Sequence, residues 1–274
     1  MTPTKKIFFT VLFFLSPGFL FSQEIITDRP DRTESVETVG KNKFQVETGI
    51  EYSSFKFTAP FTNETGAEIG NTEVKNKTLT IPTTLLRYGI LKNVELRLGI
   101  DFDRSYATSD VSEFENSQKL SLNPPKLGAK VEIAKGEGIK PDFSVIGAFT
   151  LPNIGAEEKQ IQYIVPELIL SFSNEINDNF SVGYNFGIET THKIKVTDFF
   201  YSVSIGMSIN PKLGVFAEFF GDTPNDDFET SSRSVDGGLT YLIKNNIQVD
   251  AYGGLGLSEN ANDFFLGTGI AFKF

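Results

Sequence analysis

Apolar residues alternate with polar or small residues along most of the chain after Phe44, in stretches of about ten residues. A period of two sends the two sets of side chains to opposite faces of a β-sheet. The clearest stretches are 44–53, 94–103, 180–189 and 247–257, and weaker ones lie near 76–90, 125–134, 142–151, 163–173, 198–209, 212–221, 233–243 and 263–274. The pattern therefore predicts an all-β chain of about twelve antiparallel strands.

The connections between these strands alternate between long polar segments and tight turns. The long ones lie near 58–75, 104–124, 152–162, 190–197, 222–232 and 258–262, and the short ones near 91–93, 135–141, 174–179, 210–211 and 244–246. A soluble β-sandwich also has alternating strands, but it has no reason to sort its loops by length. Long loops on one rim, short turns on the other and an even strand number are typical of outer-membrane barrels. We therefore predict a transmembrane antiparallel up-and-down β-barrel over residues 43–274, with long outer loops and short periplasmic turns.

The polar face of the predicted strands carries many charged side chains. Unpaired carboxylates cannot fill a dry core, whereas they can line a wet lumen while the Phe-rich face meets lipid. The residues predicted to line the lumen are Glu47, Glu51, Glu95, Arg97, Asp101, Glu132, Glu189, Glu218, Asp236 and Asp250. Such an acidic excess raises the local concentration of cations and disfavours anions. The alternative is a polar network that fills the barrel and conducts nothing, and the strand number alone does not choose between the two.

Residues 1–22 predict a secretory signal peptide. Lys5 and Lys6 form the basic region, residues 7–15 form the apolar region, and a cut before Gln23 would release the mature chain. Nine residues are too few to cross about 30 Å of hydrocarbon as a helix. Export to the outer membrane of a Gram-negative bacterium follows as the expected location.

Residues 23–42 form a charged N-terminal segment on the periplasmic side, before the first strand. Its charged residues are Asp28, Arg29, Asp31, Arg32 and Glu34. The segment could fold into the lumen as a plug, with its arginines paired to wall carboxylates. It could equally be a disordered periplasmic tail.

The last strand ends on an aromatic residue, Phe274, with Phe272 and further apolar residues at every second position before it. This ending resembles the signal that the barrel-assembly machinery recognises in outer-membrane proteins. A closed barrel has no unpaired edge, so this strand is expected to pair with the first one, near residues 44–52. Membrane lipid and the assembly machinery are therefore the expected partners.

Composition removes several other classes of function. The chain has no Cys and a single His, so it offers no disulfide framework and no zinc site of the usual kind. With a net charge of −10 it is a poor nucleic-acid binder, because duplex binding rests on Lys and Arg. His192 precedes Ser202, Ser204 and Ser208, but no nucleophile motif surrounds them. We predict no enzyme activity, no metal and no cofactor.

Three prolines fall within predicted strands, at Pro82, Pro125 and Pro166. Proline cannot donate to a strand ladder, so each one implies either a bulge in the wall or the first residue of its strand. The second interpretation is the simpler one, and we expect each strand to begin at its proline.

The mature chain also resembles a family of outer-membrane transporters named for the meta-pathway of phenol degradation. The segments that carry the resemblance are 26–35, 85–90, 236–242 with 248–250, and the closing strand 264–274. The resemblance implies an outer-membrane barrel with a transport role, but no defined substrate and no site residues.

The function expected from the sequence is an outer-membrane channel or passive transporter for small molecules, apolar ones included. The alternative is a non-conducting structural or surface-interaction barrel.

Overall fold

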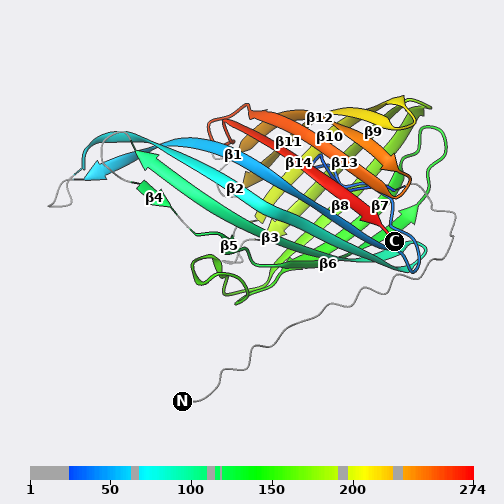
Figure 1. Ribbon diagram of the computed structural model, residues 1–274, viewed down its shortest axis with the longest axis horizontal. Helices are drawn as coiled ribbons and strands as arrows, with labels where there is room; N and C mark the ends of the chain where they lie inside the picture. The colour runs from blue at the N-terminus through cyan, green and yellow to red at the C-terminus, as the bar shows by residue number, and fades with distance from the viewer. Residues whose placement is uncertain (1–24, 63–67, 110–114, 118, 191–196, 225–230) are drawn as a thin grey trace, which may run out of the picture.

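The computed structural model describes residues 25–62, 68–109, 115–117, 119–190, 197–224 and 231–274. The predicted signal peptide and His192 lie outside these residues. Within them, twelve long strands form a closed antiparallel β-barrel, which confirms the predicted fold class and strand number (Figure 1). No helix among the described residues has the length and apolar character needed to cross a bilayer.

The barrel wall is an up-and-down meander in chain order. Its strands are β1 (Phe44–Thr62), β2 (Glu68–Leu91), β3 (Val94–Ser109), β6 (Lys126–Ala134), β7 (Asp142–Thr150), β8 (Val165–Asn177), β9 (Phe180–Thr190), β10 (Thr197–Asn210), β11 (Leu213–Pro224), β12 (Ser232–Lys244), β13 (Ile247–Gly256) and β14 (Phe264–Lys273). Two short strands, β4 (Glu115–Ser117) and β5 (Ser121–Leu122), pair with β3, and a single 3-10 turn, η1 (Glu157–Lys159), lies between β7 and β8.

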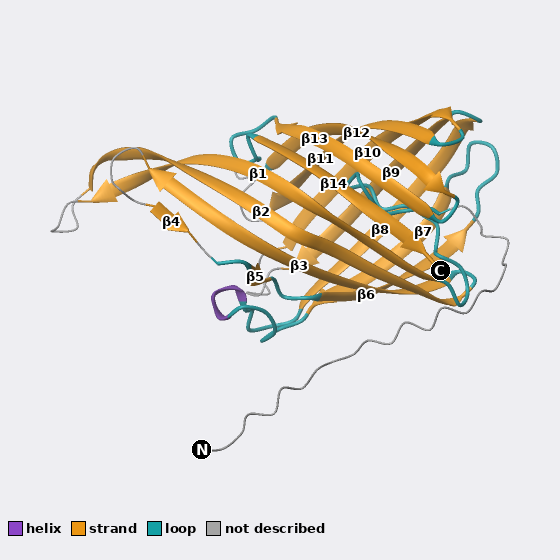
Figure 2. Ribbon diagram, in the orientation of Figure 1, coloured by secondary structure: helices purple, strands orange, loops and turns teal. Residues whose placement is uncertain are grey.

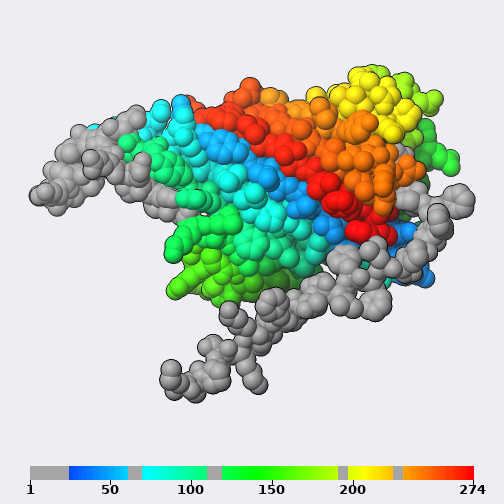
Figure 3. Space-filling model, in the orientation of Figure 1, coloured from blue at the N-terminus to red at the C-terminus, as the bar shows by residue number. Residues whose placement is uncertain are grey.

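Pairing of the last strand with the first closes the barrel, as the sequence predicts. The register runs from Gln45 opposite Lys273 to Ser54 opposite Phe264. Phe44 and Phe274 exchange two backbone hydrogen bonds of 3.2 and 2.8 Å, and their rings stack with centroids 6.4 Å apart. In Figure 3 the β14 and β1 bands lie side by side along the outer surface. The start of β1 and the end of β14 thus meet at the rim that carries the short turns.

The distribution of polar and apolar side chains is the reverse of that in a soluble protein. The largest fully buried side chains are mostly polar or charged, namely Arg87, Lys130, Gln45, Glu47 and Glu95. The outer face exposes large apolar residues on strand after strand, among them Leu96, Leu168, Phe186, Ile205, Leu255 and Leu266. A surface of this kind is stable against lipid hydrocarbon and unfavourable in water.

Strands β1, β2 and β3 extend far beyond the rest of the wall (Figures 1 and 2). The sequence prediction of a long loop at 58–75 is therefore wrong in large part, whereas the one predicted at 104–124 begins later, after Ser109. β1 reaches Thr62, β2 starts at Glu68 and β3 reaches Ser109. Residues 58–62 pair with residues 68–73, from Thr58 opposite Glu73 to Thr62 opposite Glu68.

The three prolines behave in two ways. β6 begins directly after Pro125 and β8 begins one residue before Pro166, as expected for prolines at strand starts. The expectation is wrong for Pro82, because β2 runs through it and its register with β3 shifts between Thr80 and Thr83. The missing N–H of Pro82 is accommodated by this bulge.

Candidate functional site

Residues 25–42, here called the inner segment, lie inside the half of the barrel that is nearest the short-turn rim. The backbone N–H of Ile25 donates to Asn245 O at 2.8 Å, and that of Asn42 donates to Gly89 O at 2.7 Å. Val36 and Val39 are buried against the lumen wall. Contact with Gly40 requires glycine at position 89, because a Cβ there would lie 1.8 Å from Gly40 O. The wall and the segment are therefore fitted closely to each other.

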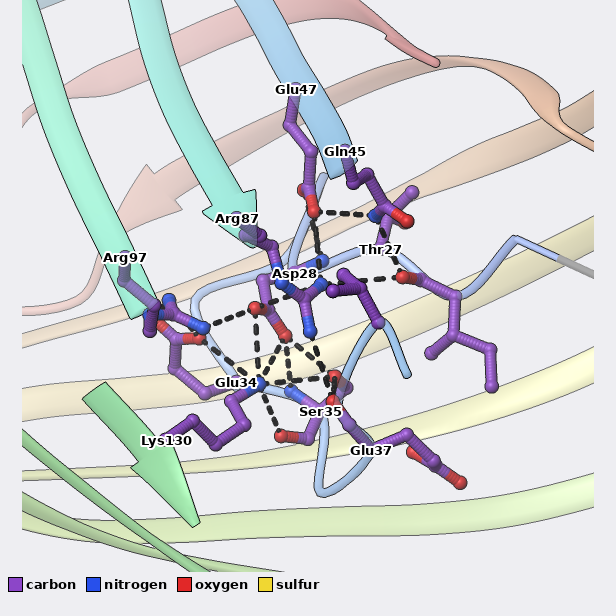
Figure 4. Close-up of polar contacts among 12 residues, drawn as sticks. Thr27, Asp28, Glu34, Ser35, Glu37, Gln45, Glu47, Arg87, Arg97 and Lys130 are labelled. Carbon is purple, nitrogen blue, oxygen red and sulfur yellow. Dashed lines mark hydrogen bonds and ion pairs between the residues drawn. The ribbon is translucent and has the colours of Figure 1, made fainter. Parts of the chain in front are cut away.

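The first anchor of the inner segment is the carboxylate of Asp28, which lies among three cations of the wall (Figure 4). Its oxygens accept hydrogen bonds from Lys130 Nζ at 2.9 and 3.0 Å and from Arg97, and Arg87 lies 3.0 Å away. Ser35 adds its backbone N–H and its hydroxyl. Burial alone would raise the pKa of Asp28, but the three cations hold it well below its ordinary value. Asp28 is thus charged at neutral pH.

Arg87 of β2 connects the wall to the inner segment. It is fully buried and bonds Glu95 at 2.8 and 3.1 Å and Glu47 at 3.0 Å. It also donates to the carbonyl oxygens of Ile26 at 3.2 Å and Glu37 at 2.9 Å. Every donor group of the guanidinium therefore has an acceptor, which is the condition for burying it at acceptable cost.

The second anchor is an ion pair between Arg29 and Asp250 of β13. The distances from the guanidinium to the carboxylate are 3.2 and 3.3 Å. Arg29 also donates to Thr83 Oγ1 at 2.9 Å, and its guanidinium lies 5.9 Å from the ring centroid of Tyr252. Glycines at 49 and 269 leave room for it, since a Cβ at either would lie 2.5 Å from the guanidinium.

The third anchor brings Asp31, Arg32 and Thr33 onto strands β10–β12. Glu218 accepts the backbone N–H of Arg32 at 2.8 Å and the hydroxyl of Thr33 at 2.5 Å. Glu218 lies directly opposite Asp236 in the β11–β12 register, so two carboxylates face each other on the lumen side. Burial and the neighbouring Glu218 raise the pKa of Asp31 to about 8. Asp31 is thus largely protonated at neutral pH.

Beyond the inner segment, toward the long-loop rim, the lumen opens into a cavity of about 840 Å³. Eight acidic residues line it, against four basic ones. The acidic set is Asp28, Glu34, Glu47, Asp101, Glu167, Glu189, Asp198 and Asp222, and the basic set is Arg29, Arg32, Arg97 and Lys126. Lys126 bonds Glu167 at 2.7 Å and Glu189 at 3.1 Å. Phe200, Phe220 and Phe265 supply an aromatic part of the lining.

The residues singled out from the sequence fall into several places. Glu47, Glu95 and Arg97 meet Asp28 and Glu34 in one charged cluster, and Asp250 and Glu218 hold the second and third anchors. Asp101 and Glu189 line the cavity, and Glu51 accepts the hydroxyl of Tyr252 at 2.7 Å. Glu132 lies apart from these groups, 3.6 Å from Lys135 at the short-turn rim. Phe272 and Phe274 end the closing strand.

Sequence reasoning missed Arg87 and Gln45 as partners of the inner segment. Gln45 donates to Ile26 O at 2.8 Å and to Glu47 at 2.8 Å. The period of two does place Gln45 on the same face as Glu47. Arg87 lies in a stretch rich in Leu and Thr, where alternation is weak, so its face could be found only from strand register.

Comparison with known proteins agrees with the fold. The crystal structure of an outer membrane channel from Pseudomonas putida F1 matches with a TM-score of 0.59 and 11% identity, over 87% of this chain and 98% of that one. The Ralstonia pickettii toluene transporter matches with a TM-score of 0.44 and 10% identity, over 85% and 89%. No curated relative matches the sequence. The model of the family described as "MetA-pathway of phenol degradation" matches residues 27–274. This chain therefore belongs to that family, as the sequence motifs indicated.

Proposed function

We propose that the protein is a passive outer-membrane channel for small solutes, partly closed by its inner segment. The observation that carries the proposal is the arrangement of the lumen. A closed barrel with an apolar outer face holds a cavity of about 840 Å³ whose lining includes many charged residues, and the inner segment lies between this cavity and the short-turn rim. The fold shared with the Pseudomonas putida channel supports this proposal. It involves no catalytic step.

The contacts of the inner segment favour a movable closure over a permanent core. Its anchors are ion pairs and hydrogen bonds, made by Asp28, Arg29 and Thr33. Water that enters a lumen can replace such contacts group by group, whereas it cannot replace a buried apolar interface. A rearrangement of residues 25–35 would therefore connect the cavity to the periplasmic side without opening the barrel wall.

The outer face supports placement in the outer membrane, with export by the N-terminal signal. Aromatic side chains gather on this face near the short-turn rim, where rings of Phe143, Phe172 and Tyr184 stack with centroids 4.9 and 5.2 Å apart. Belts of aromatic residues mark the interfaces of transmembrane barrels. The protein should fractionate with the outer membrane and should migrate faster on gels unboiled than boiled. Equal mobility in both states, with the protein in the soluble periplasm, would contradict this placement.

The charge of the cavity lining supports a preference for cations. Acidic residues outnumber basic ones by eight to four. Glu47 and Glu95 are bound to Arg87, so their charge is compensated locally. Asp101 and Glu189 are better placed to act on a passing ion, because they line the open part of the lumen.

The test is conductance in planar bilayers. Deletion of residues 25–35 should raise single-channel conductance while the protein keeps its gel shift between unboiled and boiled samples. Asp101→Asn with Glu189→Gln should lower the cation preference, measured as a reversal potential across a salt gradient. The effect should fade near 1 M salt, where the screening length is about 3 Å. Glu175→Gln, on an exposed turn-proximal position of β8, is the matched control and should change nothing.

Absence of conductance before and after the deletion, in correctly folded protein, would overturn the channel proposal. The non-conducting structural or surface-interaction barrel would then be the better interpretation.

A further inference from the structure

The inner segment places one cation against an aromatic ring inside the cavity. The guanidinium of Arg32 lies 5.3 Å from the ring centroid of Phe220. The guanidinium also lies 3.9 Å from Glu51, a long distance for an ion pair, and the Arg32 side chain is 53% exposed. Both Arg32 and Phe220 line the cavity. The position between Phe220 and Glu51 therefore suits a cation. The guanidinium of Arg32 occupies it now, but with only weak contacts.

Two further carboxyl groups of the wall lie close to this position. Glu218 and Asp236, which are 3% and 8% exposed, lie directly opposite each other on β11 and β12. Like charges in such a pair repel one another. Among the described residues, neither carboxylate oxygen of Asp236 has a hydrogen-bond partner. The backbone N–H of Arg32 donates to Glu218 at 2.8 Å, which places Arg32 beside this pair.

The aromatic part of the site extends beyond Phe220. The ring of Phe265 from β14 meets it edge-on, with centroids 6.0 Å apart. Serines at 202 and 234 are the register neighbours of Phe220 on either side, so no bulky side chain flanks its ring. Gly254 leaves room for the Phe265 ring, which would lie 2.2 Å from a Cβ at that position. The result is a flat apolar surface beside a group of carboxylates.

We propose that this position is a binding site for small organic cations, in which an ammonium or guanidinium group is attached to an aromatic or similarly flat apolar body. The cation would take the place of the Arg32 guanidinium, near Glu51 and Asp236, and its apolar body would lie on Phe220 and Phe265. Aromatic faces attract cations through the ring quadrupole, and the attraction grows as water is excluded. Arg32 acts as an internal stand-in for the ligand.

The charge pattern separates this class of ligand from two others of similar shape. An aromatic anion would be repelled by Glu51, Glu218 and Asp236. A neutral aromatic compound would gain contact with the rings but nothing from the carboxylates. The inference deepens the proposed function, since the ligand reaches the site from the cavity of the channel.

The experiment measures binding rather than transport. Benzylammonium, benzyl alcohol and benzoate share a ring and differ in charge, so each is titrated by calorimetry into the full mature chain in a non-ionic detergent. Benzylammonium should bind saturably and at least ten times more tightly than the other two, a difference of about 1.4 kcal/mol. Equal affinities for the three compounds, or no saturable binding of benzylammonium, would overturn the proposal.

Variants locate the site. Phe220→Leu should weaken benzylammonium binding several-fold, whereas Phe219→Leu, the adjacent residue on the outer face, should leave it unchanged. Asp236→Asn should weaken binding, and Arg32→Gln should tighten it, because the competing guanidinium is gone. Tightening by Arg32→Gln cannot result from misfolding, so it remains decisive if Phe220→Leu folds poorly. Loss of binding in Arg32→Gln, or equal effects of the two Phe variants, would contradict the assignment.

The inference and the proposed function can fail separately. A protein that binds benzylammonium but never conducts would retain the site and lose the channel. A protein that conducts cations yet does not bind benzylammonium would retain the channel and lose the site.

Discussion

Replacement of Arg87 by methionine is the sharpest test of the charged cluster at the base of the lumen. The cluster contains four carboxylates, of Asp28, Glu34, Glu47 and Glu95, and three cations, of Arg87, Arg97 and Lys130. Methionine keeps much of the volume of arginine and removes its charge and donors. Glu47 then loses its ion pair with Arg87.

The expected cost is about 3–5 kcal/mol, the range for breaking a buried ion pair and leaving the partner charge uncompensated. We expect a cost at the low end of this range, because residues of the inner segment can move and admit water to the carboxylates that have lost their partner. A loss of about 3 kcal/mol is still a large part of a stability that is typically 5–15 kcal/mol. It should appear as a lower urea midpoint for unfolding from lipid vesicles, with an unchanged slope.

A second substitution identifies the cause as charge rather than volume. Glu95 accepts two hydrogen bonds from Arg87, at 2.8 and 3.1 Å. Glu95→Gln should therefore be destabilising in the parent but much less so when added to Arg87→Met, with a coupling of about 1 kcal/mol or more. Arg233→Met, at an exposed position of β12, should stay within about 0.5 kcal/mol of the parent. A cost below about 1 kcal/mol for Arg87→Met, or additivity of the two changes, would refute the reasoning.

Three further predictions follow from the faces of the wall and from the inner segment. Leu98→Arg should lower the free energy of unfolding by about 2–4 kcal/mol in the same assay, because Leu98 faces lipid. Gly99→Arg should lower it less, because Gly99 lines the cavity. Equal losses would mean that the two faces are inverted. The pKa of Asp31 is raised to about 8, so the folded state binds this proton more tightly than the unfolded state does. Attachment of the inner segment should therefore weaken as the pH rises from about 4 toward 8. Trypsin cleavage after Arg32 should therefore accelerate with pH more steeply in the parent than in Asp31→Asn, and identical profiles would reject the assignment. Gly89→Ala should detach the end of the inner segment near Gly40 and speed amide hydrogen exchange at Asn42. Gly147→Ala is the control and should have no such effect, because nothing lies within 4 Å of the added Cβ. Equal exchange rates in the two variants would contradict the contact between Gly89 and Gly40.

The fold could be predicted from the sequence to the extent that a period of two determines it. Alternation places each strand and its lipid face, and the loop lengths indicate closure. The prediction failed where strands extend beyond the rest of the wall, at residues 58–62 and 68–75, because these stretches lack a clear alternation of polar and apolar residues and their strand form depends on pairing with each other. The expectation that a strand begins at Pro82 failed for a related reason. The bulge that accommodates this proline depends on pairing with the neighbouring strand and not on the local sequence.

The contacts of the lumen could not be predicted from the sequence, because they depend on register between distant strands. In the wall alone, Arg87 lies directly opposite Arg97, and Glu218 lies directly opposite Asp236. Like charges directly opposite each other are unfavourable, and in the first pair Glu47 and Glu95 of the wall offset part of the repulsion. The inner segment brings Asp28 to the first pair, and the backbone N–H of its Arg32 donates to Glu218 of the second.

The two compensations differ in strength. Asp28 is buried and ion-paired to both arginines of the first pair. Arg32 is half exposed, and its guanidinium lies 3.9 Å from the carboxylate of Glu51. The wall therefore holds the inner segment more tightly at Asp28 than at Arg32. A cation from solution can compete with Arg32 at this weak contact. Binding of a cation at the Phe220 site is therefore expected to favour release of the part of the inner segment around Arg32.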